Sequence, residues 1–355
     1  MANLSVITKF FFFSLLLTAC TNASKETKEK KQFELIGETQ GTTFTIKIVD
    51  TSCNVNASEV KDLLAQFDLA LSSYVARSII SKVNEQALGT VAYYDSLGFF
   101  SHCFNKSTDV FKRTQGAFEP SIFPLVKAWG FFKDEQKVLQ QNEVNNLLKI
   151  VDFNSGIFYD FRCVKDSFYY TKKHKDFKLD FNAIAQGYAV DVLCDLLESK
   201  NHHSYYVEIG GELRVSGRNS QNELWKIGID KPIDDTENQT NRPLQTIVSF
   251  SNGSIATSGN YRKFYIKDGK KYAHILSPTT GFPVNHSLLS ATVFTKEAAF
   301  ADGFATAFMV LGLEKTQEFL KNNPDLKLEV YLVYAADSVH NKTWASKGFK
   351  GIIQK

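Results

Sequence analysis

An aspartate and a threonine near the C-terminal end of the chain have the spacing of a metal site on a helix. Asp302, Ala305 and Thr306 stand at i, i+3 and i+4, so the carboxylate and the hydroxyl face one side, a turn apart. Hard oxygen ligands of this kind suit Mg²⁺, which completes its octahedron with water and substrate phosphate. The same spacing fits an aspartate near a helix start and a threonine bonded back to its own helix.

A single histidine is the candidate for proton transfer. His274 follows an apolar and aromatic pattern that predicts a strand over residues 272–276, which places the imidazole at a strand end. Its reference pKa lies near neutrality, as a general base requires. A lone histidine is more often a satisfied structural residue, so the residue type alone leaves both roles open.

A small-residue turn at Ala183 separates two different periodicities. Alternation over Phe177, Leu179 and Phe181 predicts a strand, and apolar residues then recur at helical spacing at Val190, Leu193, Leu196 and Leu197. Asp180 and Gln186 flank the turn. The backbone groups of such a turn face a crevice where a ligand can bind, although an ordinary strand-to-helix connection fits the same pattern.

The remaining pattern predicts an α+β protein with mixed sheets and packed helices. Phe44, Ile46 and Ile48 alternate as a half-buried strand, and Asn56 with Glu59 has the capping-box spacing of a helix start. Further strands are predicted over residues 205–209, 213–215, 225–229, 246–250, 288–295 and, last, 328–334, and helices over 299–311 and 315–322. Strands often follow each other directly, which disfavours a regular βαβ array.

Composition limits the classes of partner. The chain has 43% hydrophobic residues and thirty phenylalanines among its 355 residues, ample for a large core in one or two merged domains. A formal charge of +3 and scattered lysines argue against a nucleic-acid partner. There is no G-x-G-x-x-G after a first strand and no P-loop pattern, so any nucleotide binds outside those cradles.

The N-terminus predicts a lipoprotein. Lys9, an apolar run over residues 10–17 and the sequence Leu-Thr-Ala-Cys ending at Cys20 are typical of an export signal, with residues 1–19 removed and lipid on Cys20. The run is too short to span a bilayer, and a buried segment is the alternative. Residues 20–32 are expected to form a lysine- and glutamate-rich tether, leaving 33–355 as the functional domain.

The other cysteines do not form a metal motif. Cys53, Cys103, Cys163 and Cys194 are widely separated and include no C-x-x-C pair, so a zinc site is not predicted. An exported protein could bridge two of them, but the spacing defines no connectivity.

An ordered series of short motifs resembles the ApbE family, the FAD:protein FMN transferases. The matching segments lie, in order, at residues 40–44, 67–74, 118–131, 178–191, 207–212, 255–262, 274–281 and 301–306. Each is short, but together they run from about Gly37 to beyond Gly312. The resemblance implies a fold related to the T-fold, FAD as substrate, and Mg²⁺ as the metal.

The resemblance also assigns roles to individual residues. It implies a metal site at the backbone oxygen of Ala183 with Asp302, Thr306 and the Ala305 position, where some members carry Asp, and it makes His274 catalytic. The expected FAD contacts, with Tyr74 and Phe118 against a ring, are Gln40, Tyr74, Phe118, Glu119, Pro120, Asp180, Gln186 and Leu276. The hydroxyls of residues 257–260 are expected near the phosphates.

The implied reaction transfers FMN from FAD to a Ser or Thr hydroxyl of an acceptor protein and releases AMP. Suggested acceptors are subunits of ion-pumping NADH:quinone oxidoreductases, reached by a membrane-anchored lipoprotein on the periplasmic side of the bacterial envelope. Ser277 departs from the family, which usually has Asp there. An FAD pyrophosphatase and a non-catalytic FAD-binding lipoprotein therefore remain as alternatives.

Overall fold

An eight-stranded antiparallel sheet organises the residues that the computed structural model describes, which are 29–154, 156–233, 242–261, 263–337 and 339–354. The predicted signal peptide, the lipidation site Cys20 and most of the tether lie outside these ranges. The strand order in the sheet is β1-β2-β6-β7-β10-β13-β14-β15. Its strands are β1 (Lys31–Thr39), β2 (Thr42–Asp50), β6 (Tyr205–Ile209), β7 (Glu212–Ser216), β10 (Gly253–Gly259), β13 (Leu288–Thr295), β14 (Glu329–Ala335) and β15 (Asn341–Ala345).

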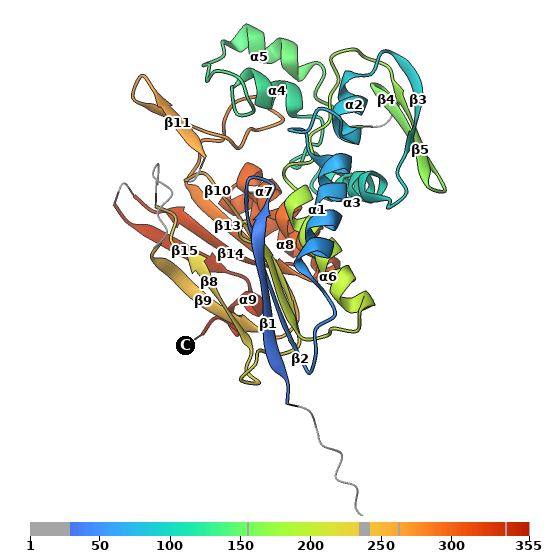
Figure 1. Cartoon of the computed structure of the whole chain (residues 1–355). Helices are drawn as coiled ribbons and strands as arrows, with labels where there is room; N and C mark the ends of the chain where they lie inside the picture. The colour runs from blue at the N-terminus through green and yellow to red at the C-terminus, as the bar shows by residue number, and fades with distance from the viewer. Residues whose placement is uncertain (1–28, 155, 234–241, 262, 338, 355) are drawn as a thin grey trace, which may run out of the picture.

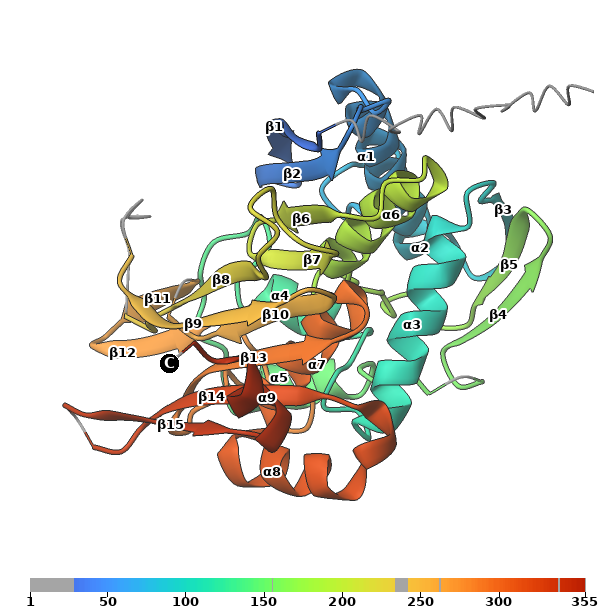
Figure 2. The same cartoon turned by 90° about the horizontal axis from the view of Figure 1, so that it is seen from below.

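Helices cover one face of this sheet (Figure 1, Figure 2). A main core cluster joins Phe44 and Ile46 of β2 to apolar residues of these helices, including Phe304 and Phe308. The helices are α1 (Ala57–Leu71), α2 (Ile79–Glu85), α3 (Phe99–Arg113), α6 (Ala185–Ser199), α7 (Ala298–Leu311) and α8 (Leu313–Asn322). A short 3-10 helix, Pro324–Leu326, follows α8.

A second, smaller core covers the opposite face. The two-stranded sheet of β8 (Trp225–Asp230) and β9 (Leu244–Phe250) packs there with α9 (Lys347–Ile352). Phe349 of α9 stacks on Tyr331 with ring centroids 5.4 Å apart. The sheet is therefore buried on both faces, as the high apolar content predicts.

A third cluster caps one end of the sheet. It contains α4 (Phe123–Ala128), α5 (Gln141–Leu148) and the hairpin of β11 (Phe264–Lys267) and β12 (Lys270–Ala273). Trp129 is fully buried in this cluster and donates its indole N–H to the Gly281 carbonyl at 2.8 Å. The cap thereby ties the loop after His274 to α4.

A separate three-stranded sheet lies beside α3. Its order is β3-β5-β4, with β3 (Gly89–Tyr94), β4 (Tyr159–Val164) and β5 (Ser167–Lys172). Phe100 of α3 stacks on Phe168 of β5 with centroids 4.5 Å apart. Several phenylalanines gather here, because stacked and edge-on rings fill the space between helix and sheet.

The α+β class is confirmed, with two refinements. Every strand pairing found among the described residues is antiparallel, where the sequence suggested mixed sheets. The strand predicted as last, β14, is followed by β15 and α9, whose short polar segments carry little periodic signal.

The strand predicted over residues 177–181 is wrong, although its burial pattern is right. Phe177, Leu179 and Phe181 are at most 1% exposed, but the segment joins no sheet. Asn84 replaces a partner strand: its side-chain amide donates to the Leu179 carbonyl at 2.8 Å and accepts from the Leu179 N–H at 2.7 Å. A side chain can thus satisfy an extended backbone that alternation alone assigns to a sheet.

Two local predictions are partly confirmed. Asn56 caps α1 by accepting the Glu59 N–H at 3.0 Å, but the Glu59 carboxylate pairs with Lys200 at 2.7 Å. The strand expected over 272–276 ends at Ala273, so His274 lies just beyond it.

The four cysteines other than Cys20 are free in the described structure. Among the same residues, no helix has both the length and the apolar character needed to cross a membrane.

Replacing Asn84 tests the side-chain pairing of residue 179. Asn84→Ala should lower the free energy of unfolding by about 3 kcal/mol, because two buried backbone groups lose their only strong partner. Urea denaturation measures this change. Asn146→Ala on exposed α5 is the control and should change stability by less than about 0.5 kcal/mol. Equal effects of the two substitutions would contradict the pairing.

Candidate functional site

Helices α6 and α7 cross at a glycine, and this crossing brings Asp302 against the first turn of α6. A Cβ atom at Gly187 would lie 2.3 Å from the Ala298 carbonyl oxygen and 2.9 Å from the Asp302 Cβ, so a larger residue would separate the helices. The Gly187 N–H donates to the Asp302 carboxylate at 3.1 Å. Ala183 lies four residues before Gly187, in the turn that leads into α6.

The Asp302 carboxylate has the properties of a cation ligand. It is 6% exposed, and burial raises its pKa above the ordinary value. Among the described residues the Gly187 N–H is its one hydrogen-bond donor, and it forms no ion pair. A buried carboxylate without a counter-charge is costly, and a bound metal ion would supply that charge.

The neighbouring oxygen atoms complete a set that fits Mg²⁺. Thr306 shares a 3.0 Å hydrogen bond with the Ser258 hydroxyl of β10, whereas Ala305 is fully buried and offers no side-chain ligand. No group of three His, Cys, Asp or Glu side chains within the described ranges is arranged to hold a metal. The site would therefore depend on the Ala183 backbone oxygen, one carboxylate and hydroxyls, a donor set that suits a hard cation.

The other hydroxyls expected near the phosphates divide between the two faces of the sheet. Ser258 faces α7, but Thr257 faces the other way, pairs with Thr292 at 2.8 Å and lines a cavity of about 240 Å³ beside β8. Alternation along β10 allows only one of two consecutive residues to face the site.

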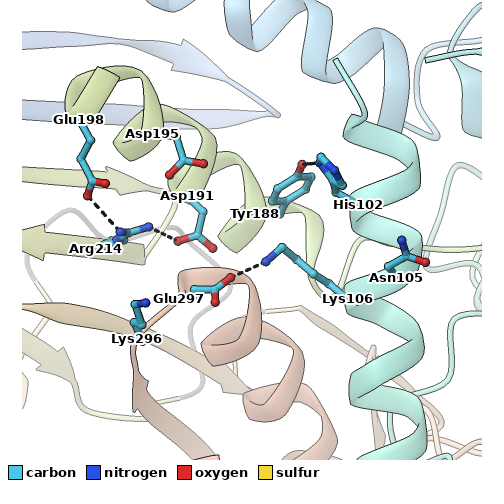
Figure 3. Close-up of a pocket in the computed structure, with 10 residues that line it drawn as sticks. All are labelled: His102, Asn105, Lys106, Tyr188, Asp191, Asp195, Glu198, Arg214, Lys296 and Glu297. Carbon is cyan, nitrogen blue, oxygen red and sulfur yellow. Dashed lines mark hydrogen bonds and ion pairs between the residues drawn. The ribbon is translucent and has the colours of Figure 1, made fainter. Parts of the chain in front are cut away.

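A buried aspartate on α6 fixes the start of α7. Asp191 accepts the Ala298 and Ala299 N–H groups at 3.0 and 2.9 Å, and it pairs with Arg214 at 3.2 Å. Figure 3 shows Arg214 between Asp191 and Glu198, and Lys106 of α3 reaching Glu297. These residues line a cavity of about 560 Å³, and none of the predicted site residues lines it.

The loop at residues 118–121 is held by its own glutamate. The Glu119 carboxylate accepts the Ser121 N–H at 2.8 Å and the Ser121 hydroxyl at 2.6 Å, and burial raises its pKa to about 7. The Pro120 carbonyl accepts the Asp180 N–H at 2.7 Å. The expectation that Glu119 and Pro120 fix this loop is consistent with these contacts, and the loop adjoins the 180–183 turn.

Two aromatic residues expected at a ligand ring differ in exposure. Tyr74 is 53% exposed and packs against Phe132 at 4.7 Å, whereas Phe118 is 2% exposed within the main core. Burial, and then the nearby Asp180 carboxylate, raise the pKa of Tyr74. Tyr74 therefore has a ring face available to a ligand, and the prediction of ring stacking by Phe118 is not supported.

Asp180 and its neighbours join the turn to the loop after α1. Its carboxylate accepts the Asn182 N–H at 2.8 Å, and burial raises its pKa to about 6. Asn182 in turn donates to the Ser73 hydroxyl at 3.4 Å. Asp180, Asn182 and Tyr74 thus lie on one side of the turn.

Two glutamines lie at the other side. Gln40 occupies the β1–β2 turn with φ of 51° and forms a side-chain hydrogen bond with Asp68. The Gln186 amide packs against Gly210, where an added Cβ would lie only 2.7 Å from its nitrogen. Gly210 and Gly211 have φ of 62° and 115°, so a tight β6–β7 turn and room for Gln186 account for the glycine pair.

His274 has a fixed tautomer and a free basic nitrogen. Its Nδ1 lies 2.9 Å from the Lys263 carbonyl, which can only accept, so Nδ1 carries the proton and Nε2 keeps its lone pair. Burial, and then the adjacent Lys263 ammonium, lower the pKa of His274 to about 4. The imidazole is therefore neutral at physiological pH.

Leu276 and Ser277 stabilise the loop that follows. Leu276 is 3% exposed in the cap core and forms an isolated bridge with Pro283. The Ser277 hydroxyl accepts the Thr280 N–H at 3.2 Å, so it closes a turn at the position where the resemblance led us to expect Asp.

The sequence did not single out several residues that build the site. Gly187, Asp191 and the Lys263 carbonyl were given no role, and each contributes through contacts between segments distant in sequence. Only Gly187 carried a signal, because a glycine inside a helical pattern often marks a close approach of another backbone.

Comparisons with known proteins agree with this fold along nearly the whole chain. A relative from Vibrio cholerae, named FAD:protein FMN transferase, is 30% identical, and the match covers 96% of this chain and 97% of the relative. The corresponding protein of Haemophilus influenzae is 29% identical over 96% of this chain and 95% of its own.

Solved structures give the same result. The flavin transferase ApbE from Vibrio cholerae superposes with a TM-score of 0.76 at 30% identity, covering 91% of this chain and 99% of its own. The apo form of the flavinyl transferase ApbE from Pseudomonas stutzeri gives a TM-score of 0.77 at 29% identity. The match covers 91% of this chain and 97% of that protein.

The fold and the site define an α+β protein that offers oxygen ligands where a turn meets a buried helix, outside the Rossmann and P-loop classes. The ApbE family model matches residues 40–332. The chain belongs to the ApbE family.

Gly187→Ala tests the helix crossing. The added methyl should lower the free energy of unfolding by about 1–3 kcal/mol through overpacking against the Ala298 carbonyl. Gly303→Ala is the matched control, since its Cβ would meet only side chains of Val110 and Ile184 at 3.3–3.4 Å. Both substitutions gain the same helix propensity, so their difference in urea denaturation measures the crossing. Equal stabilities would contradict it.

An NMR titration tests the state of His274. With ¹⁵N-labelled histidine, one imidazole should titrate near pH 4, because burial and Lys263 disfavour its charged form. The neutral form is present above that pH and is lost as pH falls through it. Lys263→Met should raise this pKa, since a neighbouring positive charge is removed. A titration near the reference value of about 6.5 in both proteins would refute the assignment.

Proposed function

We propose that this chain is an FAD:protein FMN transferase that uses Mg²⁺. The observation that carries the proposal is the contact between the Asp302 carboxylate and the first turn of α6, four residues after Ala183. The names of the relatives support the same activity. FAD is the donor substrate, and the acceptor is a Ser or Thr hydroxyl of a protein.

The reaction breaks the phosphoanhydride bond of FAD and forms a phosphoester bond to the acceptor protein. The acceptor oxygen attacks the phosphorus on the FMN side of FAD, a new P–O bond forms, and the bond to the bridging oxygen breaks. AMP leaves with that oxygen, and the hydroxyl proton passes to His274 Nε2. Positioning and charge neutralisation dominate catalysis in phosphoryl transfer.

The residues of the chain divide these tasks. Ala183, Asp302 and Thr306 would hold Mg²⁺, which neutralises charge on the nonbridging and leaving oxygens when bound. Asp180 accepts hydrogen bonds from nucleotide hydroxyl or amine groups, and Tyr74 packs its exposed ring on the ligand. Gln40 and Gln186 offer amides at the other side of the turn.

Location and partners follow from the N-terminus and from the family resemblance. Lipid on Cys20 would anchor the enzyme to a membrane on the periplasmic side of the envelope, with residues 20–32 as a tether. Acceptors carry a short motif with Ser or Thr, and subunits of ion-pumping NADH:quinone oxidoreductases are suggested. Tethering keeps the enzyme near such membrane-bound acceptors.

One assay separates the candidate activities. Purified protein is mixed with FAD, Mg²⁺ and an acceptor domain, and protein-bound flavin fluorescence in a denaturing gel is followed with released AMP. Covalent flavin together with AMP supports the transferase. AMP alone indicates a pyrophosphatase, and retained FAD without AMP indicates a binding protein.

Two substitutions test the assigned roles in this assay. Asp302→Ala should abolish Mg²⁺-dependent transfer, because the buried anionic ligand is lost, and His274→Ala should retain FAD while transfer falls by about 10²- to 10⁴-fold. Asp195→Ala, an exposed carboxylate on α6, is the control and should leave transfer unchanged. Full activity of Asp302→Ala would refute the assignment of Asp302 as a metal ligand. Normal flavin labelling by His274→Ala would refute the assignment of His274 as the general base.

A further inference from the structure

The β11–β12 hairpin has a high local positive charge. Residues 263–273 contain four lysines and one aspartate, a net charge of 4 − 1 = +3, as large as the formal charge of the whole chain. Most basic residues of the chain lie elsewhere, but this short ribbon carries four of them. Figure 1 shows this ribbon projecting from the body of the molecule beside α4.

One face of the hairpin anchors it. Tyr265 and Tyr272 stack with centroids 5.2 Å apart, and Tyr272 packs on Trp129 at 5.8 Å. The Tyr265 hydroxyl donates to the Lys137 carbonyl at 3.1 Å. A two-stranded ribbon is marginally stable by itself, so these contacts hold it in place.

The tip and the other face are open to solvent. Ile266 is 66% exposed, and Lys267 and Lys270 are exposed on either side of the Asp268–Gly269 turn. No ion pair is found for Lys267 or Lys270 in the part of the chain that the structure describes. Lys267 and Lys270 pair across the strands on the face that carries Tyr265 and Tyr272, where the Lys270 ammonium lies 5.5 Å from the Tyr272 ring centroid, and Ile266 lies on the opposite face. The tip thus presents two exposed lysines with an exposed isoleucine beside them, which suits a partner that is both acidic and apolar.

The base of the hairpin is the catalytic histidine. The His274 backbone N–H and its Nδ1–H both point to the Lys263 carbonyl, at 3.1 and 2.9 Å, so the two ends of the ribbon meet at this residue. A protein segment that presents a hydroxyl to His274 Nε2 therefore lies next to the hairpin.

Lysines on strand edges also prevent edge-to-edge pairing. That role explains charge on the ribbon but not the exposure of Ile266, because an apolar side chain at an edge promotes contact. The position at His274 and the mixed character of the surface favour a recognition role.

We propose that the β11–β12 hairpin docks the acceptor protein and selects a segment with Asp or Glu side chains flanking the hydroxyl that receives FMN. Lys267 and Lys270 pair with those carboxylates, and Ile266 contacts an apolar side chain of the segment. The proposal rests on the transferase function for its substrate. The charges steer the acceptor to His274 and fix its register.

A binding experiment tests the surface without requiring transfer. Short fluorescent peptides with one central Thr are flanked by Asp and Glu, or by Asn and Gln, and fluorescence anisotropy measures their affinity for the full chain. The acidic peptide should bind about tenfold more tightly than its amide counterpart, and added salt should narrow the difference. The double variant Lys267→Glu, Lys270→Glu should lose the preference.

A charge-matched variant controls for net charge. Lys315→Glu with Lys321→Glu changes two exposed lysines of α8 and should keep the preference. Equal affinity of both peptides for the natural chain, or a preference retained by the hairpin variant, overturns the proposal. Displacement of the acidic peptide by an oligonucleotide, or by anionic phospholipid vesicles, at far lower concentration than by the unlabelled peptide also overturns it.

Transfer assays distinguish this proposal from the function on which it rests. With an acceptor domain, the hairpin variant should show a raised KM for acceptor and unchanged FAD affinity. If the hairpin variant transfers flavin with an unaltered KM for the acceptor, the transferase function is supported and the docking surface is refuted. If the chain prefers the acidic peptide but attaches flavin to no acceptor, the docking surface is supported and the transferase function is refuted.

Discussion

The close crossing of α6 and α7 at Gly187 is the contact on which the rest of the site depends. The absence of a side chain brings the Ala298 carbonyl and Asp302 against the first turn of α6. Asp191, one turn further along α6, takes the first free N–H groups of α7 and prevents that helix from sliding. Because helix N–H groups need partners, one buried carboxylate sets the register of a second helix.

Three buried carboxylates around the turn differ in how they are satisfied, and this difference separates structural from ligand-binding roles. Burial raises the pKa of Glu119, Asp180 and Asp302. Glu119 is surrounded by donors of its own loop, so it serves to shape that loop. Asp302 receives a single N–H, which leaves acceptor capacity for a cation. A carboxylate buried with incomplete partners is costly to folding and is retained where a ligand completes it.

The base and its surroundings form a second, positively charged region. His274 is neutral because burial and Lys263 disfavour its protonated form, and the Ser277 hydroxyl accepts the Thr280 N–H in the loop that follows. A base of low pKa accepts a proton less readily but is always in the correct protonation state at neutral pH. The same ribbon that holds this imidazole presents the exposed side chains of Lys267 and Lys270, so under the proposed function one short hairpin would combine acceptor recognition with proton transfer.

Periodicity and motif order were sufficient to predict the α+β class, helices α6, α7 and α8, most strands of the large sheet, and the family. These features are local: apolar spacing decides which face of a helix or strand is buried. Only the tertiary structure revealed three other features. These are the hydrogen-bond partner of Leu179, the inward position of Phe118, and the opposite directions in which Thr257 and Ser258 point. Each depends on which distant segment supplies a contact, as Asn84 does for Leu179 and Asp302 does for Gly187. Spacing along the chain records neither partner, because packing between segments far apart in sequence decides both.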